Sequence, residues 1–164
     1  MKKYKLSFFI YVFILILFAP KVSLASLVIN EIMFDAAGTD TGHEWVEIYN
    51  NGASSVDMAA WKFVEGGSNH GLTASGSSTV AASGYAIIAD NADTFKTDYK
   101  ALTGNDFSGT LFDSTFSLSN TTGETIALKD GSSVTVDSVA YTPPAEPKEG
   151  KTLGLLSGTW ALNN

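Results

Sequence analysis

The chain has 164 residues, no cysteine, ten lysines and no arginine, against 17 acidic residues. Without cysteine, neither disulfides nor thiolate metal sites can stabilise the fold, so packing and hydrogen bonds must do so. Four of the lysines lie in the first 25 residues, and the remaining six against 17 acids give a formal charge of −11, which argues against nucleic acid as a partner.

The N-terminus has the pattern of an export signal. A lysine-rich start precedes an apolar run over residues 6–19, and Ser23 and Ala25 place small side chains where a signal peptidase reads. The apolar run is shorter than the roughly 20 residues that cross a bilayer as a helix. We therefore expect a signal peptide over residues 1–25 and a mature domain over residues 26–164, secreted or at the cell surface and without stable membrane insertion. An uncleaved anchor is the alternative.

Two strands are predicted at the start of the mature domain, over residues 27–34 and 44–50. The first is apolar on both sides of its period-2 pleat, which is typical of a central strand with both faces covered. In the second, Val46 and Ile48 face the core. The opposite face carries a stripe of Trp45, Glu47 and Tyr49, which we interpret as a packed outer surface, with a ligand platform as the alternative.

The middle of the chain continues with short elements separated by turns. A third strand contains Phe63 and Val64, and a strand over residues 85–89 is apolar enough to be buried. Between them, residues 66–78 are rich in glycine and serine and predict a mobile loop. Asn91 can cap a short helix over residues 92–101, in which Phe95 and Tyr99 lie at i and i+4.

The remainder of the chain returns to strands. These are predicted over residues 110–113, 116–119, 125–129 and 134–141, with a hairpin at Asp130 and Gly131 between the last two. The proline-rich tail over residues 142–150 cannot be a central strand. Many short strands and one helix predict an all-β fold, an antiparallel β-sandwich.

Several sequence blocks in order resemble the lamin tail domain in its exported bacterial form. The blocks are VINEIMF from residue 28, GHEWVEIYN from 42, VDMAAW from 56, SGYAIIAD from 83, FSLSN from 116, GETIAL from 123, VDSVAY from 136 and GKTL from 150. The resemblance implies an immunoglobulin-like sandwich and no catalytic residues. It further implies a protein-interaction module, as in animal lamins, or an accessory or surface module that bacteria sometimes join to nucleases or other hydrolases.

The strongest candidate for metal chemistry is the loop that holds Asp35, Asp40 and Glu44. Its oxygen ligands and glycines suit Ca²⁺, but the spacing is not that of an EF-hand, and a solvated acidic loop is the simpler interpretation. His43 and His70 lack paired metal-ligand spacing. No cofactor is expected besides this candidate calcium.

The chain contains no nucleophile elbow, phosphate-binding loop or zinc-protease motif, so we expect it not to be an enzyme. The leading hypothesis is a secreted module that binds a protein or a surface polymer. One alternative is an accessory domain of an exported hydrolase or nuclease whose catalytic part is absent from this chain. Another is a carbohydrate-binding module, in which the rings of Trp45, Tyr49 or Trp61 would have to be coplanar and exposed.

Overall fold

The computed structural model describes residues 27–146 and 148–163, so the predicted signal peptide lies outside the described residues. The strands are β1 (Leu27–Met33), β2 (Trp45–Asn50), β3 (Val56–Asp57), β4 (Lys62–Glu65), β5 (Ser68–Gly71), β6 (Thr73–Ala74), β7 (Thr79–Val80), β8 (Tyr85–Ala89), β9 (Thr110–Asp113), β10 (Glu124–Lys129), β11 (Thr135–Tyr141), β12 (Thr152–Leu156) and β13 (Thr159–Asn163). The helix is α2 (Ala92–Thr103). In the part of the chain that is described, no helix is both long and apolar enough to cross a membrane.

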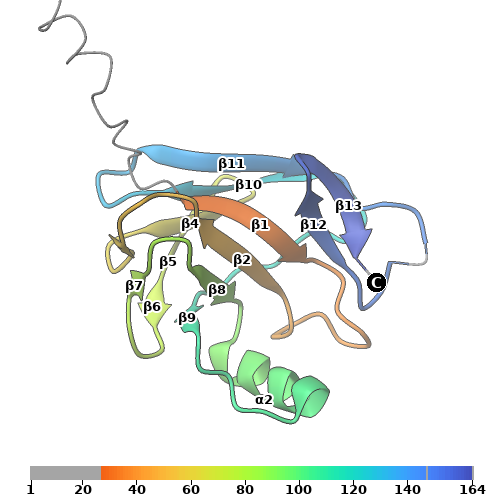
Figure 1. Cartoon of the computed structure of the whole chain (residues 1–164). Coiled ribbons are helices and arrows are strands. Elements are labelled where there is room, and N and C mark those ends of the chain that lie inside the picture. The colour runs from red at the N-terminus through yellow and green to blue at the C-terminus, as the bar shows by residue number, and fades with distance from the viewer. Residues whose placement is uncertain (1–26, 147, 164) are drawn as a thin grey trace, which may run out of the picture.

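The strands form two main sheets that pack face to face (Figure 1). The larger sheet has the order β13-β12-β1-β2-β8-β9-β6, the smaller sheet has the order β11-β10-β4-β5, and β3 pairs with β7. Neighbouring strands are antiparallel except β8 and β9, which run parallel because α2 connects them as a crossover. The predicted immunoglobulin-like β-sandwich with one short helix is confirmed.

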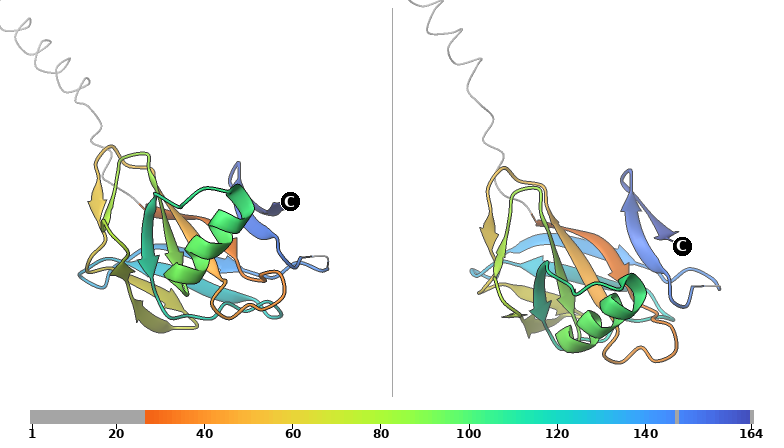
Figure 2. Two further views of the ribbon diagram at one scale, coloured as in Figure 1. Left: turned by 90° about the horizontal axis from the view of Figure 1, so that it is seen from below. Right: turned by 60° about the horizontal axis from the view of Figure 1, so that its bottom comes forward.

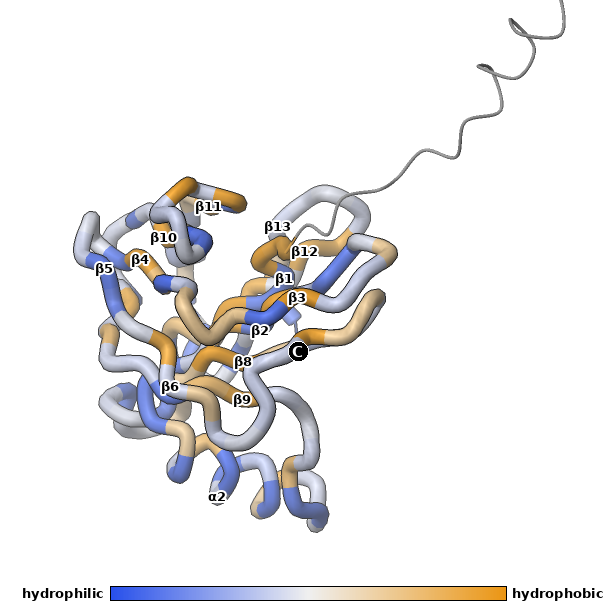
Figure 3. Tube along the Cα trace, turned by 90° about the vertical axis from the view of Figure 1, so that its left-hand side faces the viewer, coloured by the Kyte–Doolittle hydropathy of each residue, from blue (hydrophilic) through white to orange (hydrophobic). Residues whose placement is uncertain are grey.

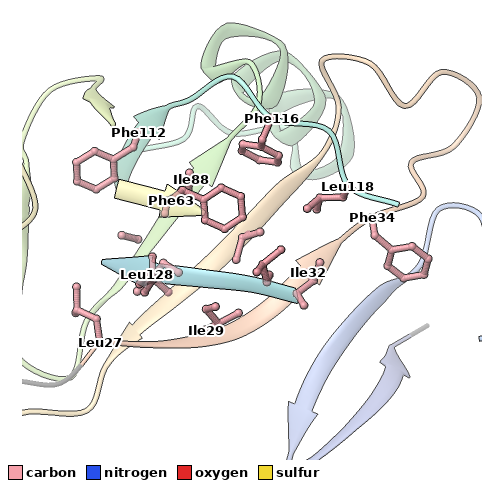
Figure 4. Packing of buried hydrophobic residues seen from close by; sticks show 14 of the residues in the cluster. Leu27, Ile29, Ile32, Phe34, Phe63, Ile88, Phe112, Phe116, Leu118 and Leu128 are labelled. Atoms are coloured by element: carbon pink, nitrogen blue, oxygen red, sulfur yellow. The ribbon is translucent and has the colours of Figure 1, made fainter. Parts of the chain in front are cut away.

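The core lies between the two sheets. The larger sheet contributes Ile29, Ile32 and Ile48, and the smaller contributes Phe63 and Leu128, all at most 1% exposed. Figure 4 shows labelled side chains from both sheets lying together in this layer. Val46 and Ile48 face the core as predicted. On β1, the residues between the buried positions are only half-buried, so its outer face is less covered than expected.

A hydrogen bond beside a bulge in β1 connects the two sheets. The register with β2 shifts between Ile29 and Glu31, and the backbone N–H of Ile29 donates to Asp137 Oδ2 of β11 at 2.7 Å. The backbone N–H of Ile29 thus has its acceptor on a strand of the smaller sheet.

Helix α2 covers the outer face of the larger sheet, where it crosses β8 and β9 (Figure 2). The Asn91 side chain caps it by accepting from the backbone N–H groups of Asp93 and Thr94, as predicted. The left-handed Gly104 ends it at φ 75°. Phe95 is buried against the sheet. The tube in Figure 3 alternates along α2 between hydrophilic and more hydrophobic stretches, as a helix with one packed face should.

The prediction of a mobile loop over residues 66–78 is wrong. Strands β5 and β6 lie in this segment, and β5 forms a hairpin with β4. The two-residue turn is Gly66–Gly67, in which both residues have positive φ. Two glycines at such a turn match the right-handed twist of a hairpin, so the composition that suggested flexibility instead builds the turn.

The predicted strand over residues 116–119 is also wrong, although its alternation is right. Phe116 and Leu118 are buried, but the segment pairs with no strand. Its backbone donors are bound by side chains instead: the N–H of Leu118 donates to Glu44 and that of Ser119 to Glu124. The two acidic side chains thus accept the backbone hydrogen bonds that the carbonyl oxygens of a neighbouring strand would otherwise accept.

Candidate functional site

Four aromatic side chains gather where α2 meets the larger sheet. The ring of Phe95 contacts Trp45 edge-on, with centroids 6.0 Å apart, and Phe107 edge-on at 5.1 Å. Tyr99 lies 6.3 Å from Phe95 and 5.1 Å from Phe107. Phe95 is buried, whereas the other three rings are only partly buried. The cluster therefore anchors the helix and also leaves aromatic surface open to solvent.

This aromatic surface lines a hollow of about 250 Å³ between α2 and strands β2 and β8. We call it the aromatic hollow. Its lining residues are Trp45, Glu47, Ile87, Phe95, Asp98, Tyr99, Leu102 and Phe107.

A second hollow, of about 340 Å³, lies beside the first. It is lined by Met33, Ala36, Ala37, His43, Trp45, Asp98, Ala101, Leu102 and Gly150, and we call it the aliphatic hollow. The two hollows share Trp45, Asp98 and Leu102, so they adjoin one another beside α2, and we call the two together the α2 groove. The β1–β2 connection contributes Ala36, Ala37 and His43 to the aliphatic hollow, and it lies beside α2 in the views of Figure 2.

The connection between β1 and β2 is fastened at several points. The N–H of Gly42 donates to Asp90 Oδ2 at 2.9 Å, and φ of Gly42 is 86°, where a side chain would be strained. The N–H of Gly150 donates to the carbonyl oxygen of Asp35 at 2.7 Å. These bonds hold one wall of the aliphatic hollow in place without a disulfide.

Two carboxylates lie in the α2 groove. Asp98 Oδ2 lies 2.7 Å from His43 Nδ1, and both side chains keep more than a third of their surface exposed. Glu47 Oε1 accepts from Asn30 Nδ2 at 2.7 Å. Burial raises the pKa of Glu47, the Asn30 bond partly offsets this, and the neighbouring Glu31 carboxylate raises it further.

The lysines of α2 pair away from the groove. Lys96 Nζ lies 3.2 Å from Asp93, and Lys100 Nζ lies 2.8 Å from Asp106, neither of which lines the groove. No lysine is among the described residues that line the groove. The groove therefore combines aromatic rings with acidic groups, and His43 is the one basic side chain among its lining residues in the described part of the chain.

The structure divides the residues predicted as a ligand platform among three places. Trp45 and Glu47 line the aromatic hollow. Tyr49 stacks on the half-exposed Tyr85 at the other end of β2, with ring centroids 4.7 Å apart. Trp61 packs against the main core at the start of β4. The three rings therefore lie in three different surroundings, and the carbohydrate-binding hypothesis, which requires coplanar exposed rings, stays a prediction.

The predicted calcium ligands are brought together only in part. Asn120 Nδ2 donates to Asp40 at 2.8 Å and lies 3.5 Å from Asp35. Lys148 Nζ lies 3.9 Å from Asp35. Glu44 is 2% exposed and accepts from the N–H of Leu118 instead. Among the described residues, no group of three His, Asp or Glu side chains is arranged to hold a metal ion.

Sequence reasoning missed half of the groove. The i and i+4 spacing of Phe95 and Tyr99 indicated a packed helix face, but nothing in the sequence placed that face beside Trp45. Phe107 follows the helix in a connection that had no predicted role. Leu102 is 87% exposed, but its exposure does not follow from the sequence, and single apolar residues at the surface are common.

Of three comparisons with known proteins, only the comparison with family models found a match. A search of curated proteins and a search of solved structures each found no match. The family model of the lamin tail domain matches residues 21–143, about three quarters of the chain. The match ends before β12 and β13, which extend the larger sheet beside β1. The chain therefore belongs to the lamin tail domain family, a family of non-catalytic immunoglobulin-like domains.

Proposed function

We propose that this protein is a secreted, non-enzymatic binding module that mediates interaction with another protein or with the cell surface through the α2 groove. The observation that carries this proposal is the open aromatic surface of the groove. Leu102 is 87% exposed and lies next to the partly exposed rings of Trp45, Tyr99 and Phe107. Aromatic side chains in hollows are the usual anchors of protein interfaces.

The chemistry of the groove supports binding over catalysis. None of its described lining residues is a serine, threonine, cysteine or lysine, so the groove lacks the hydroxyl, thiol and amine nucleophiles that these four residue types supply. Its histidine lies 2.7 Å from Asp98, and among the described lining residues there is no serine, threonine or cysteine for this pair to activate. The remaining polar side chains suit recognition and orientation of a ligand.

The two hollows have the size of side-chain pockets. Their volumes, about 250 Å³ and about 340 Å³, lie at or below the lower end of the range for small-molecule sites, which begins near 300 Å³. A groove of two such pockets suits successive side chains of a protein segment better than one enclosed metabolite. We therefore favour a protein partner over a free small molecule.

Retention on the cell envelope tests this proposal. The protein is produced from its full-length gene in wild-type form, with Leu102→Ser and with Val134→Ser, and the fraction that stays on washed cells is measured. Val134 is a matched control because it is an apolar residue, 59% exposed, that lies outside the groove. We expect Leu102→Ser to lower retention and Val134→Ser to leave it unchanged. Equal retention of all three forms would contradict the proposal.

A further inference from the structure

We propose that the α2 groove recognises a basic segment of a partner protein, with a lysine or arginine side chain in the aromatic hollow and an apolar side chain in the aliphatic hollow. This inference rests on the proposed function and names the chemistry of its partner. Two observations support it: the arrangement of the aromatic rings in the groove and the acidic side chains beside them.

The aromatic hollow suits a cation. The faces of aromatic rings attract ammonium and guanidinium groups within about 6 Å of the ring centroid. Trp45, Tyr99 and Phe107 each present partly exposed ring surface there, and Phe95 holds them at fixed angles, 77° for Trp45 and 87° for Phe107. The rings are thus ordered before a ligand arrives, which lowers the entropic cost of binding.

The carboxylates complete the site for a basic group. Glu47 and Asp98 line the same hollow as the rings. Because Lys96 and Lys100 pair with carboxylates outside the groove, they do not compete for this position. A ligand cation would therefore gain two carboxylate partners and would displace no lysine.

Charge complementarity also acts at longer range. Residues 26–164 carry six lysines against 17 acidic residues. A basic segment is attracted to such a surface, and an acidic one is repelled. The net charge thus favours the same class of partner as the groove does.

The aliphatic hollow sets a second requirement. Met33, Ala36, Ala37 and Ala101 line it, and these side chains offer a polar ligand no hydrogen-bond donor and only the weak acceptor sulfur of Met33; the polar groups of the hollow are those of His43, Asp98 and Trp45. Since Trp45 and Leu102 border both hollows, the two bound side chains lie close together in the partner. The partner chemistry is therefore one basic and one apolar residue within a short stretch of chain.

A pair of matched peptides tests this inference. One is a short glycine and serine peptide that carries a leucine and an arginine, and the other replaces the arginine by citrulline, which is nearly isosteric but neutral. Each is titrated into the ¹⁵N-labelled protein produced from its full-length gene, at physiological salt, and Kd is measured from the shifts of groove amides. We expect the citrulline peptide to bind about tenfold more weakly. Equal Kd values for the two peptides would overturn the inference.

Conservative variants separate the groove from the general charge. Asp98→Asn should raise Kd for the arginine peptide about threefold. Asp106 is 85% exposed and lies outside the groove, so Asp106→Asn should change Kd by less than about twofold. His43→Gln should preserve or strengthen binding because it frees the Asp98 carboxylate. Equal losses in Asp98→Asn and Asp106→Asn would overturn the inference.

The two proposals fail separately. If neither peptide shifts the groove amides, the basic-segment inference is wrong. The envelope-retention experiment with Leu102→Ser decides the proposed function independently of that result.

Discussion

The side-chain oxygen Oε2 of Glu44 accepts a hydrogen bond from the backbone N–H of Leu118 at 2.9 Å, although 74 positions of sequence separate the two residues. Glu44 directly precedes β2 of the larger sheet, and Leu118 lies in the extended segment that leads from the larger sheet to the smaller one. A buried side chain thus replaces a strand as the partner of that segment.

The first prediction is that stability falls as pH rises between about 4.5 and 8. Burial raises the pKa of Glu44 from 4.5 to about 8, and the Leu118 bond offsets this only in part. The folded protein therefore keeps a proton in this window that the unfolded chain has lost. The contribution of Glu44 to the free energy of unfolding is fully present below its pKa in the unfolded chain. It is lost as the pH rises to its pKa in the folded protein, at up to about 1.4 kcal/mol per pH unit. Burial also raises the pKa of Asp90 and Glu47, which acts in the same direction.

Urea denaturation at pH 5 and at pH 8.5, with wild type and Glu44→Gln, checks this prediction. Glutamine keeps an acceptor for Leu118 and cannot ionise. We expect the variant to lose less stability than wild type between the two pH values. The same loss in both proteins would show that Glu44 does not titrate in this range.

Much of the fold was readable from local signals. The Asn91 cap, the Asp130–Gly131 hairpin and the buried strand over residues 85–89 each depend on neighbours in sequence, and the structure has all three. The Gly66–Gly67 pair is also a local signal, because two glycines suit a tight hairpin turn, but the glycine-rich composition of residues 66–78 also predicts flexibility. Here the error lay in the interpretation and not in the signal.

The unpredicted features depend on contacts between distant segments. The segment over residues 116–119 alternates like a strand, and only the positions of Glu44 and Glu124 decide that it pairs with side chains. The α2 groove likewise requires Trp45 on β2 and Tyr99 on α2 to meet across the sheet surface. Hydrophobic periodicity and residue spacing carry no information about contacts between segments that are distant in the sequence.

The second prediction concerns Asn50, whose side chain is fully buried. Its Nδ2 donates to the carbonyl oxygens of Ser54, Val80 and Ala81 at 2.9–3.2 Å, and its Oδ1 accepts from the N–H of Gly52. Asn50→Ala leaves these groups without a partner and should lower the free energy of unfolding by about 3 kcal/mol. Urea denaturation measures the loss. The exposed neighbour Asn51→Ala is the control and should cost less than about 0.5 kcal/mol; similar losses would refute the role of Asn50.

The third prediction is that Leu102→Ser hardly changes stability. Leu102 is 87% exposed near the end of α2, so only a small difference in helix propensity should appear, less than about 1 kcal/mol. Phe95→Ala, in the buried centre of the same cluster, should cost about 3 kcal/mol or more. Thermal denaturation of both variants checks the contrast. A large loss in Leu102→Ser would mean that this residue supports the fold rather than a partner.

The fourth prediction concerns export. The protein made from its full-length gene should lose residues 1–25, since Ser23 and Ala25 follow a short apolar run. Intact-mass analysis of the protein from the medium or the cell surface should give a chain that begins at Ser26. Recovery of only the uncleaved chain in the membrane fraction would contradict this.

Photo-crosslinking in the producing cells tests the central claim, binding through the α2 groove, most directly. A photoreactive phenylalanine derivative replaces Leu102 in one form and Val134 in the other, and both forms are irradiated in place. Both positions are exposed and apolar, but only position 102 lines the groove. We expect a discrete protein adduct from position 102, none from position 134, and loss of the first when excess arginine peptide is added. The absence of an adduct at 102, or equal adducts at both positions, would contradict the account.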